Sequence, residues 1–106
     1  MPTLGGARTS FMLGDKKIHL QNGRLTDADG ILAGAHLSMI DAVRNMMRFA
    51  DIPLASALRM ASTTPAKALG RDHELGRIAP SFRASLTLLN RDLTVQGVLV
   101  DGQQPV

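Results

Sequence analysis

The chain has 106 residues, of which 44% are hydrophobic, and a formal net charge of +3; this suffices for a small core but not for a complete TIM-barrel enzyme of about 250 residues. It contains no cysteine, so a disulfide framework and a thiolate metal site are excluded, and no apolar run approaches the ~18 residues of a membrane span. The basic residues are scattered and phenylalanine is the only aromatic type, which argues against a nucleic-acid surface. The lack of cysteine and of a long apolar run predicts a soluble, cytoplasmic chain.

Short strands joined by tight turns are expected in the first part of the chain. Residues 10–13 and 17–21 alternate apolar with polar side chains, the pattern of strands that rest one face on a core. Asn22-Gly23 follows and is a strong signal for a two-residue hairpin turn, because both positions need a positive φ. Residues 24–26 would pair back across that turn, and Asp29-Gly30 would turn the chain again.

Three helices are expected next. Ser38 can cap the first, and the Asp-Ile-Pro segment at residues 51–53 would end it and open the second. Thr64 can cap a third, short helix over residues 65–69, which Gly70 would end because glycine readily adopts a left-handed conformation. Apolar residues of the first helix recur at helical spacing and predict a wide buried stripe. Its members are Met39, Ala42, Val43, Met46, Met47 and Ala50.

The pattern changes after Gly76. Residues 84–89 and 95–100 are rich in leucine, valine and threonine and are expected to form two strands. The polar segment at residues 90–92 would join them, and Asp101-Gly102 would turn the chain once more. We therefore expect helices in the middle of the chain and a strand pair at its end.

Several motifs in this order resemble one known family. They are Asp-Gly-Ile-Leu-Ala-Gly-Ala-His-Leu-Ser-Met at residues 29–39, Arg-Met-Ala-Ser at residues 59–62, Pro-Ala at residues 65–66 and Leu-Gly at residues 69–70. Together they resemble N-acetylglucosamine-6-phosphate deacetylase, a branch of the amidohydrolase superfamily. The resemblance covers nearly the whole chain, and it is the C-terminal portion of these enzymes that the chain resembles.

The resemblance implies a fold class and a division into two regions. The chain would be an α+β fragment, with a β-hairpin and two to three helices that end a metal-dependent TIM barrel, followed by C-terminal strands of a small β-sandwich. Residues 1–70 would be the C-terminal segment of the barrel domain, and residues 71–106 would supply the sandwich strands. The remaining sandwich strands would come from the distant N-terminal end of the full-length enzyme.

A reaction and a cofactor also follow from the resemblance. Such enzymes remove the acetyl group of N-acetylglucosamine 6-phosphate, giving glucosamine 6-phosphate and acetate in amino-sugar breakdown, and the full-length parent would use a divalent metal, zinc or iron. By the resemblance, the catalytic aspartate falls just before Met1 and the metal ligands lie further upstream. His19, His36 and His73 are far apart and lack the spacing of a zinc pair. We expect no catalytic residue, no bound metal and no activity in the isolated chain.

Substrate positioning is the role that the resemblance leaves to this chain. In the family, the loop before the first helix lies over the sugar and contacts it through backbone groups. The matching residues here are Leu32, Ala33, Gly34, Ala35 and His36. Glycine and alanine would let main-chain N–H and C=O groups approach a ligand closely. From the residues alone, however, a flexible loop that leads into Ser38 is the simpler interpretation.

Two other functions remain open. The chain could be a non-catalytic binding or dimerising module derived from the amidohydrolase fold, in which an exposed strand edge pairs with a second copy. It could also be a fragment of another amidohydrolase that acts on a cyclic amide or a deaminase-type ring. A homodimer or another association through strand edges is expected by the resemblance as well, and no nucleic-acid or membrane partner is expected.

Overall fold

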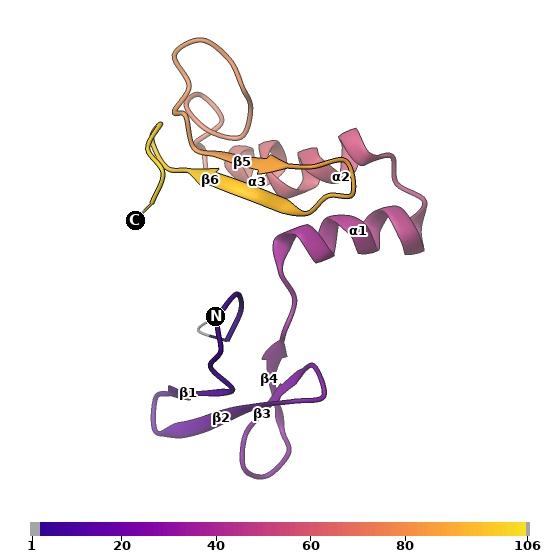
Figure 1. Cartoon of the computed structure of the whole chain (residues 1–106), viewed down its shortest axis with the longest axis vertical. Helices are drawn as coiled ribbons and strands as arrows, with labels where there is room; N and C mark the ends of the chain where they lie inside the picture. Colours follow the sequence, from indigo (N-terminus) through magenta and orange to yellow (C-terminus); the bar gives the residue numbers. More distant parts are fainter. Residues whose placement is uncertain (1–2, 106) are drawn as a thin grey trace. The chain divides into compact units, whose positions relative to one another are not determined.

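The structure, a computed structural model, describes residues 3–105. It falls into two compact units, with the division between Ser38 and Met39 (Figure 1). Each contains one antiparallel sheet, and the second also contains three helices, so the predicted α+β character is confirmed. No helix within the described residues has both the length and the apolar content needed to cross a membrane.

The first unit is a four-stranded antiparallel meander in the order β1-β2-β3-β4. Its strands are β1 (Ser10–Leu13), β2 (Lys16–Gln21), β3 (Arg24–Thr26) and β4 (Leu32–Ala35). The predicted hairpin turn between β2 and β3 is confirmed, because Asn22 and Gly23 have φ values of 50° and 74°. Ile18 and Leu25 are fully buried and form the core of this sheet.

Strand β4 replaces the loop that the sequence predicts around Gly34. Asp27 explains the difference. Its Oδ1 accepts hydrogen bonds from the backbone N–H groups of Asp29 (3.1 Å) and Ile31 (2.9 Å), and its own N–H donates to the Ile31 carbonyl (3.0 Å). This turn brings the Leu-Ala-Gly-Ala segment back antiparallel to β3, where its backbone groups find partners.

The second unit contains α1 (Met39–Ala50), α2 (Leu54–Ala61), α3 (Thr63–Ala68) and a hairpin of β5 (Leu86–Leu89) and β6 (Val95–Leu99). Pro53 precedes α2, and Gly70 follows α3 with a φ of 66°, both as the sequence predicts. In the hairpin turn, Asn90 Oδ1 accepts a hydrogen bond from the Thr94 N–H at 2.7 Å. Arg44 of α1 donates to the Leu93 carbonyl at 2.8 Å and so ties the first helix to this hairpin turn.

The predicted cap of α3 is wrong. The helix begins at Thr63, so Thr64 lies inside it, and Ser62 precedes it without a capping hydrogen bond from its side chain. The nearby hydroxyls have other partners: Ser62 Oγ donates to the Leu58 carbonyl (2.7 Å) and Thr63 Oγ1 donates to the Gly76 carbonyl (2.6 Å). A tertiary contact to Gly76 has therefore replaced the local cap that the sequence suggested.

The buried stripe predicted for α1 is confirmed only in its middle, where Ala42, Met46 and Met47 are half-buried beside Val43. Val43 is buried, but Met39 is 63% exposed and Ala50 is exposed as well. Ala57 of α2 and Ala66 of α3 complete the buried apolar residues of this unit among those described. The helical period marks the apolar face correctly, yet the described part of the chain covers it incompletely.

Candidate functional site

The five residues predicted to contact substrate lie on β4 and directly after it. Strand β4 is at the end of the sheet and pairs on one side with β3, through Arg24 with Ala35 and Leu25 with Gly34. Leu32, Ala33 and Ala35 are exposed, whereas Gly34 and His36 are half-buried. A terminal strand with small side chains presents backbone donors and acceptors along its open side. The arrangement therefore suits recognition of a polar ligand by the main chain, and that contact stays a prediction.

His36 is held by a contact from the start of the chain. Its Nε2 lies 3.2 Å from the carbonyl oxygen of Thr3, and Thr3 is buried, with 2% of its surface exposed. Because a carbonyl can only accept, Nε2 carries the hydrogen in this bond. The imidazole thus faces the protein, and the backbone before it is anchored at the end of β4.

The histidines are not brought together as metal ligands. His19 lies in β2 and His36 follows β4, whereas His73 belongs to the other unit, after α3. Between Thr3 and Pro105, no group of three or more histidine, aspartate or glutamate side chains could hold a metal ion. The donor set of the described residues does not fit a divalent metal.

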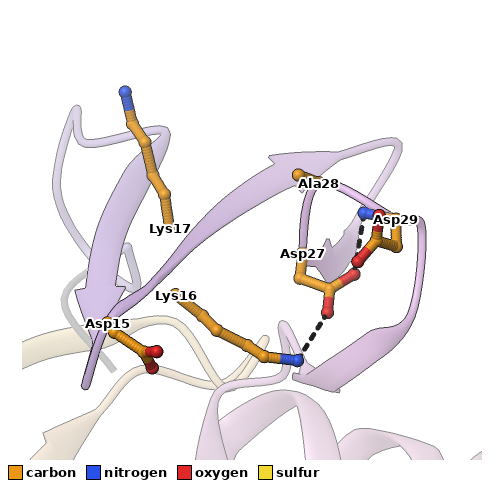
Figure 2. Close-up of a pocket in the computed structure, with 6 residues that line it drawn as sticks. All are labelled: Asp15, Lys16, Lys17, Asp27, Ala28 and Asp29. Atoms are coloured by element: carbon orange, nitrogen blue, oxygen red, sulfur yellow. Dashed lines mark hydrogen bonds and ion pairs between the residues drawn. The ribbon is translucent and has the colours of Figure 1, made fainter.

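A shallow pocket of about 200 Å³ lies between two turns of the first unit, and sequence reasoning did not anticipate it. Its lining residues are Asp15, Lys16, Lys17, Asp27, Ala28 and Asp29. Lys16 Nζ lies 3.3 Å from Asp27 Oδ2, while Lys17 points away from this pair (Figure 2). The pocket mixes both charges, and Asp27 acts mainly as the turn former that its position suggests.

The turn around Asp27 gives a pH-dependent prediction. The N–H of Ile31, helped by Lys16 and the N–H of Asp29, lowers the pKa of Asp27 below its ordinary value of 3.8. A lowered folded pKa means that the carboxylate stabilises the fold above about pH 4 and loses this effect as the pH falls through the folded pKa. Asp27→Asn keeps the accepting oxygen but cannot titrate. In urea unfolding, its stability should therefore fall less between about pH 5 and pH 2 than that of the wild type; equal slopes would contradict this role.

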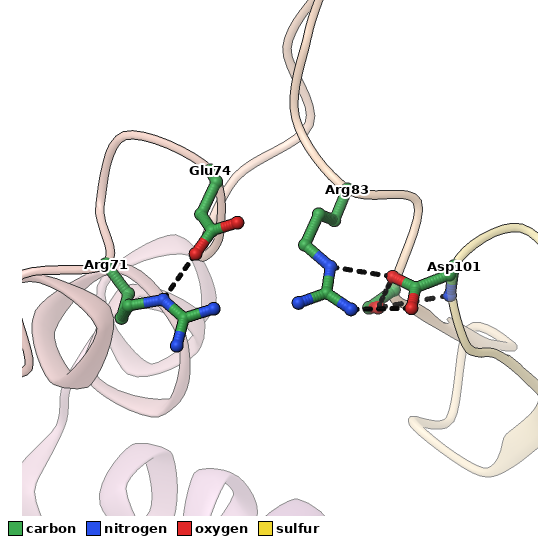
Figure 3. A network of polar contacts seen from close by, with 5 residues as sticks. Arg71, Glu74, Arg83 and Asp101 are labelled. Atoms are coloured by element: carbon green, nitrogen blue, oxygen red, sulfur yellow. Dashed lines mark hydrogen bonds and ion pairs between the residues drawn. The ribbon is translucent and has the colours of Figure 1, made fainter.

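Polar contacts also join the segment after α3 to the end of β6 (Figure 3). Arg71 pairs with Glu74, and Arg83 makes a two-pronged contact with Asp101, at 2.8 and 2.6 Å. The Arg83 guanidinium lowers the pKa of the Asp101 carboxyl. Ser85 Oγ lies 3.3 Å from the Asp101 N–H, which donates to it. These side chains fix the base of the β5–β6 hairpin.

The Arg83–Asp101 pair was missed from the sequence, and strand pairing does not predict it. Leu86 pairs with Leu99 in the hairpin, so the same register continued outward places Ala84, and not Arg83, opposite Asp101. Asp101 lies in a turn closed by the bridge between Val100 and Gln103, with a φ of 51°. The ion pair therefore depends on the conformation of this turn, which strand register alone does not give.

The chain belongs to the amidohydrolase family: the family model matches residues 24–104. It is 35% identical over 94 residues to the N-acetylglucosamine-6-phosphate deacetylase of Haemophilus influenzae, covering 89% of this chain and 25% of that protein. It is 39% identical over 93 residues to the N-acetylgalactosamine-6-phosphate deacetylase of Escherichia coli O157:H7, covering 88% of this chain and 25% of that protein.

Solved structures give the same relationship. The crystal structure of N-acetylglucosamine-6-phosphate deacetylase from Pasteurella multocida matches with a TM-score of 0.83 and 38% identity. The match covers 93% of this chain and 26% of that one. The chain thus spans about a quarter of the length of these relatives, and it matches a part of their fold.

Proposed function

We propose that this chain is the C-terminal, substrate-positioning part of a metal-dependent hydrolase. The enzyme removes the acetyl group from N-acetylglucosamine 6-phosphate, giving glucosamine 6-phosphate and acetate in amino-sugar breakdown. One observation carries the proposal: about nine-tenths of the chain, at 35–39% identity, matches enzymes named as amino-sugar-phosphate deacetylases. The proposed division places residues 1–70 at the end of the barrel and residues 71–106 in the sandwich.

The chemistry assigned to this chain is binding rather than bond cleavage. Amide hydrolysis in such an enzyme uses a divalent metal, zinc or iron, to activate water, together with a carboxylate that moves a proton. The described residues offer no metal site, so this part of the reaction is assigned to the remainder of the parent. The open side of β4 supplies what the chain itself contributes, main-chain groups that hold the sugar and its acetamide in place.

Two epimers are candidates for the sugar of the substrate. Glucosamine and galactosamine differ only in the configuration at C4, and relatives named for each have similar identities to this chain. The glucosamine form is proposed as the substrate because the Pasteurella multocida structure, at 38% identity, carries that name. Assaying both sugars makes the galactosamine form one outcome of the test.

The experiment is a chimaera of the Haemophilus influenzae relative. This chain replaces the matched 94-residue segment of that deacetylase, and acetate release is measured with N-acetylglucosamine 6-phosphate and with its galactosamine epimer. Turnover within about tenfold of the parent is expected, since the substituted part keeps the fold and the substrate backbone contacts. The unmodified relative and the same relative without the segment are the controls.

A chimaera that releases no acetate would favour the second candidate function, a dimerising module. The open sides of β1 and β4, the terminal strands of their sheet, are where a second copy would pair. In that case the isolated chain should show a concentration-dependent dimer by sedimentation velocity. A well-folded but inactive chimaera together with such a dimer would replace the enzymatic proposal.

A further inference from the structure

The contact between His36 and Thr3 joins residues 33 positions apart in the chain. Both belong to the first unit, and the contact is partly buried, with Nε2 at 3.2 Å from the Thr3 carbonyl oxygen. Thr3 itself is buried, and its hydroxyl oxygen has no hydrogen-bond partner within the described structure. A buried polar side chain without a partner opposes this placement of Thr3. The hydrogen bond from His36 to its backbone therefore helps to hold Thr3 in place.

The same bond also restrains β4, because its other partner, His36, directly follows that strand. Strand β4 has only four residues, it is the last strand of its sheet, and its register with β3 is interrupted at Leu25 and Thr26. A short terminal strand with a bulge is weakly fixed by backbone pairing alone. His36 immediately follows it, so the imidazole is placed where it can stop the C-terminal end of β4 from fraying.

We infer that His36 is a positioning residue whose imidazole fixes β4 by bonding to Thr3, so that the backbone of Leu32–Ala35 is held ready for the sugar. The role differs from direct contact, because the ring donates to the protein and not to a ligand. This inference rests on the proposed function for the part that concerns substrate. The anchoring of β4 is a property of the fold and can be measured without any activity.

The first measurement separates positioning from simple folding. In the chimaera, His36→Ala should raise KM about fivefold and leave kcat within about twofold, because backbone contacts to the sugar act alike in the ground and transition states. His36→Gln, whose amide N–H can reach a nearby carbonyl, should restore KM. A purely structural role would lower the fraction of active enzyme and hence kcat, with KM unchanged, and that result would overturn the inference.

His73→Ala is the matched control. His73 is an exposed histidine in the other unit, so removing its ring tests for a general effect of losing a histidine. Neither KM nor kcat should change by more than about twofold, as for a surface substitution. If His73→Ala raised KM as much as His36→Ala, the effect could not be assigned to the bond with Thr3 and the inference would fail.

The second measurement uses hydrogen exchange on the same chimaera. His36→Ala should speed exchange about fivefold in peptides that cover residues 3–9 and 32–36, since one hydrogen bond of ordinary strength is lost. Peptides at the β1–β2 turn should be unchanged. If the chimaera has no deacetylase activity, the proposed function fails, while the anchoring is still decided here. Unchanged exchange in both peptides would overturn the inference.

Discussion

Gly76→Ala is expected to destabilise the second unit by about 2–5 kcal/mol, the sum of left-handed strain and overpacking. Gly76 has a φ of 91°. A Cβ added there would lie 2.9 Å from both Ala66 Cβ and Thr63 Cα, and 3.1 Å from the Ser62 carbonyl oxygen. Two of these three atoms are backbone atoms around the start of α3, so the added methyl cannot be accommodated by turning a flexible side chain. The Thr63 hydroxyl, which donates to the Gly76 carbonyl at 2.6 Å, would lose its partner as the loop shifts.

Gly70→Ala is the control for this prediction. Gly70 also has a left-handed φ, 66°, but an added Cβ would meet no atom within 4 Å. It should therefore cost only the conformational strain, about 1–2 kcal/mol. Urea unfolding of both variants, followed by far-UV circular dichroism, measures the difference. Equal losses in the two variants would show that the close packing of Gly76 against α3 is wrong.

Leu25→Ala is expected to remove most of the stability of the first unit. Leu25 is fully buried, and its neighbours across the sheet are Leu20 of β2 and Gly34 of β4. Truncating a buried leucine costs about 2–5 kcal/mol. A unit of 38 residues has a total stability of only about 2–6 kcal/mol at typical values per residue. One side chain therefore decides whether this sheet, and β4 with it, stays formed.

Hydrogen exchange of the strands β1–β4 measures this effect directly. Leu25→Ala should abolish most of their protection, whereas Met12→Ala should change it little, because Met12 is 60% exposed. The pair compares a buried with an exposed apolar residue in the same sheet. If strong protection survived in Leu25→Ala, the core of the first unit would not depend on this side chain.

Local patterns predicted most of the elements. Alternation and the Asn22-Gly23 turn place β2 and β3, and apolar spacing with Pro53 and Gly70 places the helices. Strand β4 could not be predicted in this way, because the Leu-Ala-Gly-Ala segment lacks alternation and β-branched residues. Its conformation depends on the Asp27 turn and on pairing with β3, a contact between segments and not a property of the segment.

The predictions of where α3 begins and of full burial of the α1 stripe fail for a related reason. The hydroxyl of Thr63 bonds to Gly76, 13 residues away, and this partner is invisible to a local capping rule. The period of α1 correctly shows one apolar face, but burial depends on what packs there. Met39 is 63% exposed. A stripe of apolar residues therefore predicts which face of a helix can be buried, but it does not show whether another segment packs against that face.

The residues of the candidate site could be predicted, but their arrangement in space could not. The resemblance named the segment from Leu32 to His36, and the structure places Leu32–Ala35 on a terminal strand with His36 directly after it. It could not name Thr3 as the partner of His36, because nothing local links the two residues. The contact between the backbone of this strand and an amino sugar stays a prediction.

Acetate release tests most directly whether this chain positions the substrate while the rest of the enzyme performs the chemistry. The 106-residue chain and the chimaera are assayed side by side on N-acetylglucosamine 6-phosphate with added zinc or iron. We expect turnover from the chimaera and none above background from the chain alone, because we propose that this chain positions the substrate and that the rest of the parent enzyme holds the metal; among the described residues no group of three or more histidine, aspartate or glutamate side chains could hold one. Turnover by the chain alone, proportional to its concentration and absent from a mock preparation, would contradict the view that the chemistry is performed elsewhere in the enzyme.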